Sequence, residues 1–146
     1  MSGIINSAGS RSGVIGTTEL DYEEGTWTPP TGTVNSIDFV MSSHEGCVYT
    51  KIGNTVFLSG EVTFGANTAD YEPVYIGGLP FVPTATTGNF CGKAHTFNYT
   101  HTPSVVIQDG QNYISLKKSF DAEDFVRRTD SRYQAYIFSI AYKTAS

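Results

Sequence analysis

The residues of this sequence that could hold a metal ion are three histidines, His44, His95 and His101. Two cysteines, Cys47 and Cys91, are the candidate thiol nucleophiles. Ligands from one strand face follow one another at spacings such as i and i+2, whereas His95 and His101 are six positions apart across an expected turn. That arrangement disfavours a metal site within one chain, although a threefold axis would bring three copies of one histidine together. We expect no metal and no other cofactor.

Nucleophiles and paired acids give no enzyme signature. Neither cysteine lies in a motif that activates a thiol, and no serine occupies a Gly-x-Ser-x-Gly elbow. The acidic clusters within residues 21–24 and 121–124 supply carboxylates, but nothing places two of them across a cleft, as glycoside hydrolysis requires. Solvated faces or salt bridges account for them better. We predict a protein that is not an enzyme, with a polysaccharide hydrolase as the weakest alternative.

The cysteines also bear on the compartment. The sequence shows no secretory leader, so we do not expect a disulfide framework. We expect both thiols to be reduced and to be buried or half-buried.

Aromatic side chains are the remaining candidates for ligand binding. The chain has 9 Tyr, 9 Phe and one Trp, more than one small core has to hide, so some should line an interface or stack on sugars. Trp27 is followed by Pro29-Pro30, and burial as a core or interface anchor is favoured over a ligand platform for this residue.

Composition limits the partners and the fold. A net charge of −5 with scattered Lys and Arg disfavours nucleic acid, and no apolar run approaches the roughly 20 residues of a membrane-spanning helix. A chain of 146 residues has room for one core, and its abundance of Tyr, Phe and Gly is typical of β-structure. We predict a single all-β domain without nucleic-acid or membrane partners.

Residues 1–20 form a segment of different character. They are rich in Gly and Ser and show neither a helical nor a strand period, yet they contain two β-branched pairs, Ile4-Ile5 and Val14-Ile15. Solvated linkers avoid such pairs. We predict an extended arm whose four apolar residues anchor on a partner or a sister subunit; packing on the arm's own domain is the alternative.

The strongest strand signal lies in residues 46–64. Gly53-Asn54 separates the run 46–53 from 55–64, which predicts a hairpin. In the second run Val56, Leu58, Gly60, Val62 and Phe64 alternate with more polar neighbours. This period of two is typical of a sheet with one buried face.

Further strands are expected between turn signals, and one helical turn is expected at 121–128. The strand candidates are 36–42, 73–81, 88–99, 104–108, 112–118 and 132–143, and the prolines confine the extended piece around Trp27 to a sheet edge or a strand start. This spacing predicts an antiparallel β-sandwich, jelly-roll-like or related, over residues 21–146. Both faces of the last strand are apolar, so one face should meet the core and the other a neighbouring subunit.

Four segments carry a resemblance to a known family. They are SGVIG (12–16), DYEEGTWTP (21–29), YTKIGNTVFLSGEV (49–62) and IGGLPF (76–81). In this order they resemble bacteriophage virion proteins that occur as tail-fibre tips and as small structural proteins of the particle. The resemblance implies a β-sandwich that assembles as a homotrimer on the virion and is made in the bacterial cytoplasm. Met1 lies shortly before the first segment, so we expect mounting through the arm rather than through a shaft.

Two functions remain open. The first is a capsid cement or decoration protein that binds the major capsid protein, or another virion protein, through residues 1–20 and projects a trimeric β-domain. The second is a tail-fibre or receptor-binding tip protein that recognises host surface glycan through loops and exposed aromatics.

Overall fold

The structure, a computed structural model, describes residues 21–34, 37–39, 41–65, 73–84, 89–96, 102–108, 110–118, 125–126 and 134–145. These ranges contain ten strands and no helix. The strands are β1 (Tyr22–Thr26), β2 (Gly32–Val34), β3 (Ile37–Phe39), β4 (Met41–Ile52), β5 (Thr55–Phe64), β6 (Tyr75–Ile76), β7 (Phe90–Thr96), β8 (Ser104–Ile107), β9 (Ile114–Lys117) and β10 (Ala135–Lys143). No helix in the described part of the chain is able to span a membrane.

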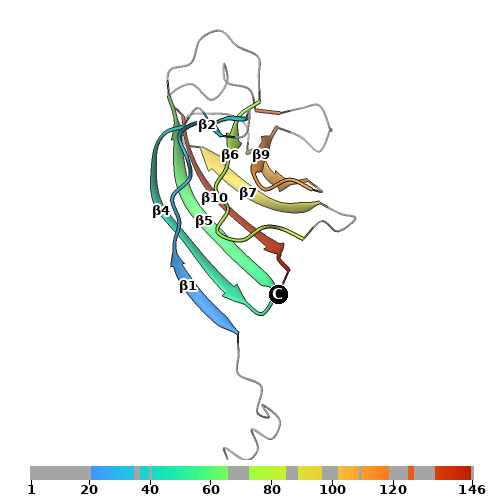
Figure 1. The fold of residues 1–146 in the computed structure, drawn as a ribbon. Helices are drawn as coiled ribbons and strands as arrows, with labels where there is room; N and C mark the ends of the chain where they lie inside the picture. Colours follow the sequence, from blue (N-terminus) through green and yellow to red (C-terminus); the bar gives the residue numbers. More distant parts are fainter. Residues whose placement is uncertain are drawn as a thin grey trace, which may run out of the picture.

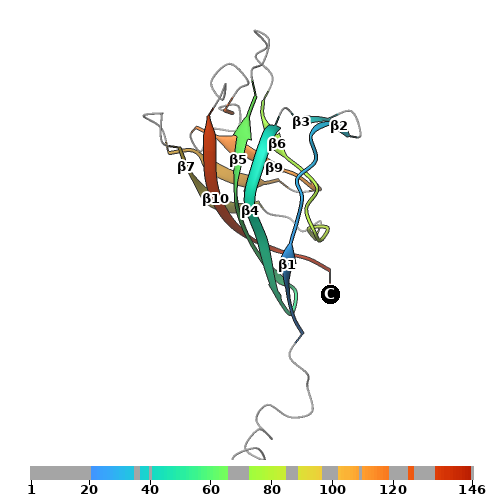
Figure 2. The ribbon, with the colours of Figure 1, turned by 90° about the vertical axis from the view of Figure 1, so that its left-hand side faces the viewer.

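Eight strands form one antiparallel sheet in the order β1-β4-β5-β10-β7-β8-β9-β6, and β2 pairs with β3 alone. Figure 1 shows the large sheet curled into a half-barrel, with the chain after β6 crossing its open side. In Figure 2 the outer face of β4, β5 and β10 is turned toward the viewer. The all-β, antiparallel fold predicted from the sequence is confirmed. A single curled sheet, rather than two separate sheets, encloses the core.

The predicted hairpin at Gly53-Asn54 is present between β4 and β5. Gly53 has a φ of +58°, a conformation that a Cβ atom disfavours, and the register closes with Ile52 opposite Thr55. Val56, Leu58, Gly60, Val62 and Phe64 are all buried, as their alternation predicted. The period of two therefore separates a core face from an outer face along β5.

β10 repeats this division beside β5. Tyr136, Phe138, Ile140 and Tyr142 point into the core, and the phenol ring of Tyr136 meets the edge of Phe64 at 5.7 Å between centroids. The alternate residues of β10 face outward. The sequence prediction that β10 has two apolar faces, one of them in the core, is confirmed for residues 135–143.

Other strand predictions hold less completely. Residues 88–99, 104–108 and 112–118 contain β7, β8 and β9, whereas 73–81 contains only the two-residue β6 because glycines and Pro80 interrupt pairing. β1 lies at an end of the sheet, as expected for a strand that runs into prolines. Most of the expected helical turn at 121–128 lies outside the described residues, and Phe125 within it bridges to Lys117.

Residues at the end of β10 bind the segment that follows β6. The hydroxyl of Tyr142 donates to the carbonyl of Phe81 at 3.0 Å, and the Thr144 hydroxyl donates to the Val82 carbonyl at 2.9 Å. These bonds hold the segment that crosses the open side against the sheet. Burial raises the pKa of the Tyr142 phenol to about 12.

Gly92 allows β7 to approach β10. A Cβ atom at this position would lie 2.1 Å from the Ser139 carbonyl oxygen and 2.8 Å from the Ile140 Cα atom, and backbone atoms cannot move aside cheaply. Gly92→Ala should lower the free energy of unfolding by about 1–3 kcal/mol. Cys91→Ala, at the exposed neighbouring position, should stay within about 0.5 kcal/mol of the wild type. Equal stabilities in urea titrations would contradict this account of Gly92.

Tyr142 should make stability depend on alkaline pH. An unfolded tyrosine loses its proton near pH 10, but the folded Tyr142 holds it to about 12, so stability falls as pH rises through this window. Tyr142→Phe should be about 1 kcal/mol less stable than the wild type at pH 8, because the hydrogen bond to Phe81 is lost. The wild type then loses about 2–3 kcal/mol between pH 10 and 12, so the order should reverse. Chemical denaturation at several pH values measures the gap; a constant gap would refute the role of this phenol.

Candidate functional site

The start of β1, where the chain leaves residues 1–20, is tied firmly to β4. The Lys51 ammonium binds the Asp21 carboxylate at 2.6 Å, with side chains 10% and 58% exposed, and its Nζ atom lies 5.8 Å from the centre of the Phe81 ring. The Tyr49 hydroxyl donates to Glu23 at 2.7 Å, and its ring crosses Gly25, where a Cβ atom would clash with it. The root of the arm is therefore fixed to the inner side of the sheet.

Hydrogen bonds to these carboxylates perturb two phenols. The bond to Glu23 raises the pKa of Tyr49, and the bond to Glu24 raises the pKa of Tyr22, because a nearby carboxylate favours the protonated phenol. Both tyrosines therefore stay neutral donors well above neutral pH. Glu23 and Glu24 thus accept hydrogen bonds from tyrosines, whereas the sequence favoured solvated faces or salt bridges for these acids.

The free edge of β1 presents backbone groups. Trp27 N–H donates to the Cys47 carbonyl and Gly53 N–H donates to the Asp21 carbonyl, so the odd-numbered residues bond to β4. Tyr22, Glu24 and Thr26 consequently direct their N–H and C=O groups away from β4. Charged side chains on such an edge discourage pairing with an identical edge. Glu23 and Glu24 protect β1 in this way.

The outer face of the sheet carries an uncharged patch. Its members are Val48, Thr50 and Ile52 from β4, Thr55, Phe57 and Ser59 from β5, and Ile137, Ser139 and Ala141 from β10. Phe57 is 49% exposed and Val48, Ile52 and Ile137 are each more than 40% exposed. The patch therefore combines four exposed apolar side chains with the hydroxyl groups of Ser and Thr, and exposed apolar groups gathered on one face are typical of interaction sites.

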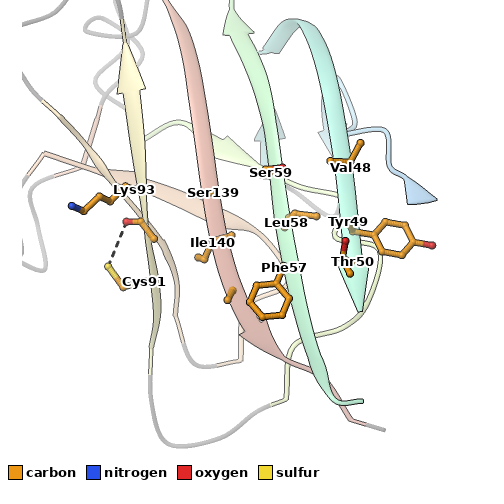
Figure 3. A pocket seen from close by; sticks show the side chains of 12 residues that line it. Val48, Tyr49, Thr50, Phe57, Leu58, Ser59, Cys91, Lys93, Ser139 and Ile140 are labelled. Carbon is orange, nitrogen blue, oxygen red and sulfur yellow. Dashed lines mark hydrogen bonds between the residues drawn. The ribbon is translucent and has the colours of Figure 1, made fainter. Parts of the chain in front are cut away.

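A hollow of about 520 Å³ lies between the uncharged patch and β7 (Figure 3). Small side chains of β5 and β10, Ser59, Ser139 and Ala141, leave the space, while Val48 and Phe57 stand on one side of it and Cys91 and Lys93 on the other. In Figure 3, β10 runs between Cys91 and Phe57. The hollow opens to the outer face, and the residues that line it include no arrangement of acid, base and nucleophile.

The candidate ligands of a metal are dispersed in the structure. His44 is half-buried on β4 and His95 is exposed on β7, while His101 lies outside the described residues. Within the described ranges, no three His, Cys, Asp or Glu side chains come together as a metal site requires.

The cysteines lie on opposite faces of the sheet. Cys47 is buried with its sulfur 2.5 Å from where a Cβ atom of Gly60 would stand, and burial raises the pKa of its thiol. Cys91 is a free, exposed thiol on the outer face. The expectation of a buried or half-buried thiol is right for Cys47 and wrong for Cys91, because Cys91 shares the outward register of Lys93.

Trp27 lies in the core and not on a binding surface. It is 6% exposed and meets Phe138 edge to face at 6.3 Å between ring centroids. The structure thus places Trp27 as the core anchor that the sequence favoured. The predicted arm anchors Ile4, Ile5, Val14 and Ile15 lie outside the described residues.

The sequence pattern does not point to the individual residues of the uncharged patch. Alternation places Phe57 on the more polar side of β5, while the excess of aromatic residues and the apolar outer side of β10 indicate a further contact without locating it. The missing signal was the adjacency of β10 to β5, which joins outward residues far apart in sequence. No protein-family model, curated protein or solved structure matches this chain.

Asp21→Ala tests the attachment of the arm's root. Removing the carboxylate leaves the mostly buried Lys51 ammonium without its charged partner, which should cost about 1–2 kcal/mol of unfolding free energy. The amide of Gly53, which donates to the Asp21 carbonyl, should exchange its hydrogen faster. Glu24→Ala removes an equal charge three residues further along, but its partner is an exposed tyrosine, so stability should hardly change. Equal losses in both variants would contradict a specific role of Asp21.

Proposed function

We propose that this protein is a non-enzymatic structural component of a bacteriophage particle. It acts as a cement or decoration protein that binds the major capsid protein or another virion protein through residues 1–20 and projects its β-domain as a homotrimer from the particle surface. The observation that carries the proposal is that two features occur together. The chain is fixed to the sheet at Asp21, where residues 1–20 end, and an uncharged patch lies on the adjoining outer face. A domain with both features is suited to assembly.

The sequence segments supply the phage context of the proposal. Those from residues 21–81 that resemble phage virion proteins coincide with parts of the fold that have clear structural roles. DYEEGTWTP forms β1 and its entry into the core, YTKIGNTVFLSGEV forms the β4–β5 hairpin, and IGGLPF forms the segment that covers the open side. The resemblance thus falls on residues that define this domain.

An arm of this composition suits multivalent attachment. Residues 1–20 would become ordered on binding, and each copy would give up conformational entropy for a small buried area. Three arms on one trimer offset that cost through their effective concentration at the surface. Weak binding by each arm would therefore add up to stable attachment of the trimer.

A second candidate function rests on Phe57. An exposed aromatic ring beside the hydroxyls of Ser59 and Ser139 is a chemistry that also suits stacking on a sugar, as a receptor-binding tail protein requires. Copy number on purified particles separates the two. A number that follows the capsid lattice supports the decoration protein, and the few copies that a tail carries would support the tail protein.

Deleting residues 1–20 tests the proposed attachment. The truncated protein should keep its fold and its oligomeric mass but lose binding to particles that lack the protein, as measured by co-sedimentation. Replacing both apolar pairs, Ile4-Ile5 and Val14-Ile15, by serine in the full chain should have the same effect, because the anchoring contacts are lost. Replacing the four arm serines by alanine serves as the matched control and should leave binding intact. Full binding by the truncated protein would overturn the proposal.

A further inference from the structure

The charged side chains on the outer face of β1, β4, β5, β10 and β7 are sorted by sign. The strands β1, β4 and β5 contribute only acids, Glu24, Glu45 and Glu61, whereas β10 and β7 contribute only basic types, Lys143, Lys93 and His95. The uncharged patch lies between these groups. The outer face thus has an acidic half and a basic half that meet between β5 and β10.

The acidic half contains an unfavourable pair that a partner would relieve. Glu45 and Glu61 stand directly opposite each other on neighbouring strands, where like charges repel. Lys143 binds the oxygens of Asn54 and Thr55, and Glu24 accepts from Tyr22, so these two charges have neutral partners. A basic surface docked on the acidic half would lower the electrostatic free energy.

The two halves also differ in shape. Phe57 projects from the acidic half, and the hollow floored by Ser139 and Ala141 opens toward Cys91 and Lys93 of the basic half. One face therefore carries both a projecting ring and a space of about 520 Å³ beside it. An aromatic ring that fills such a pocket is the usual anchor of a protein interface.

We propose that this outer face binds a second copy of the chain, acidic half against basic half, with Phe57 of one copy seated in the hollow of the other. The inference rests on the proposed assembly of the protein and assigns the surface through which copies meet. A single sequence here supplies both complementary halves, which identifies another copy as the partner. The acidic side chains of β1 disfavour the alternative of joining copies edge to edge.

The dimensions of the face suit such a contact. Five strands spaced about 4.8 Å apart and four outward residues along each give a face of about 600 Å². Two copies that meet across the whole face, the acidic half of each against the basic half of the other, would cover about 1,200 Å² in total, at the lower limit of stable interfaces. The charged groups at its margins and the uncharged centre match the usual division into rim and core.

A disulfide trap tests the contact with the native Cys91. Within one chain Phe57 and Cys91 lie on either side of β10, about 10 Å apart, which is too far for an intramolecular disulfide. Phe57→Cys in the full chain, equilibrated in a glutathione redox buffer, should form intermolecular disulfides between positions 57 and 91, identified by non-reducing gels and peptide mass spectrometry. A ring of three copies closes as a covalent trimer of three times 15.8 kDa.

Val82→Cys is the matched control, because Val82 is 72% exposed but lies outside the uncharged patch. It should stay uncrosslinked under the same conditions. Crosslinking of Val82→Cys as fast as that of Phe57→Cys would overturn the assigned surface. A covalent dimer as the final product would support the surface but refute the homotrimer of the proposed function.

Phe57→Glu measures the contribution of the projecting ring. The ring is half exposed in the single chain, so the variant should fold normally, while the dissociation constant between copies rises by roughly thirtyfold or more. Light scattering across a concentration series, with Val82→Glu as control, reports the mass. A wild type that is monomeric at all concentrations, or a Phe57→Glu variant that assembles unchanged, would overturn the inference. Particle binding after deletion of residues 1–20 is a separate readout, so the two proposals can fail independently.

Discussion

The pairing of β5 with β10 is the contact on which the rest of the molecule depends. Its register runs without a shift from Ala135 opposite Thr63 to Lys143 opposite Thr55. Because side chains alternate along both strands, this one register places Leu58, Phe138 and Tyr142 in the core and aligns Phe57, Ser139 and Ala141 outside. A slip by one residue would exchange the two faces. Core stability and the character of the outer surface are therefore coupled.

Local pattern was sufficient to predict the parts of this sheet that depend on neighbouring residues. The alternation of residues 55–64 and the Gly53-Asn54 turn define the β4–β5 hairpin, since a tight turn joins strands adjacent in sequence. β6 was overestimated because residues 73–81 have strand-like composition, yet Gly77-Gly78 and Pro80 remove the side chains and the donor that pairing requires. Composition alone did not reveal that interruption.

The candidate site was harder to predict because it depends on contacts between distant parts of the chain. Cys91 and Phe57 flank the same hollow only because β10 lies between β7 and β5, and no local signal orders those three strands. The close approach of β7 depends on the absence of a side chain at Gly92. The sequence did show that β10 has two apolar sides. Together with the surplus of Tyr and Phe, this second apolar side indicated a further contact surface but not its position.

Leaving an uncharged patch in water costs free energy, and the fold gives no internal reason for it. Replacing Phe57 or Ile137 by a polar residue would leave the core contacts of Leu58 and Phe138 in place, so stability of the single domain does not require these side chains. The patch begins at Ile52, which lies opposite Tyr22 and next to Lys51 of the ion pair that fixes the arm's root. The proposed attachment through residues 1–20 and the proposed contact between copies would therefore use different surfaces, so neither would block the other.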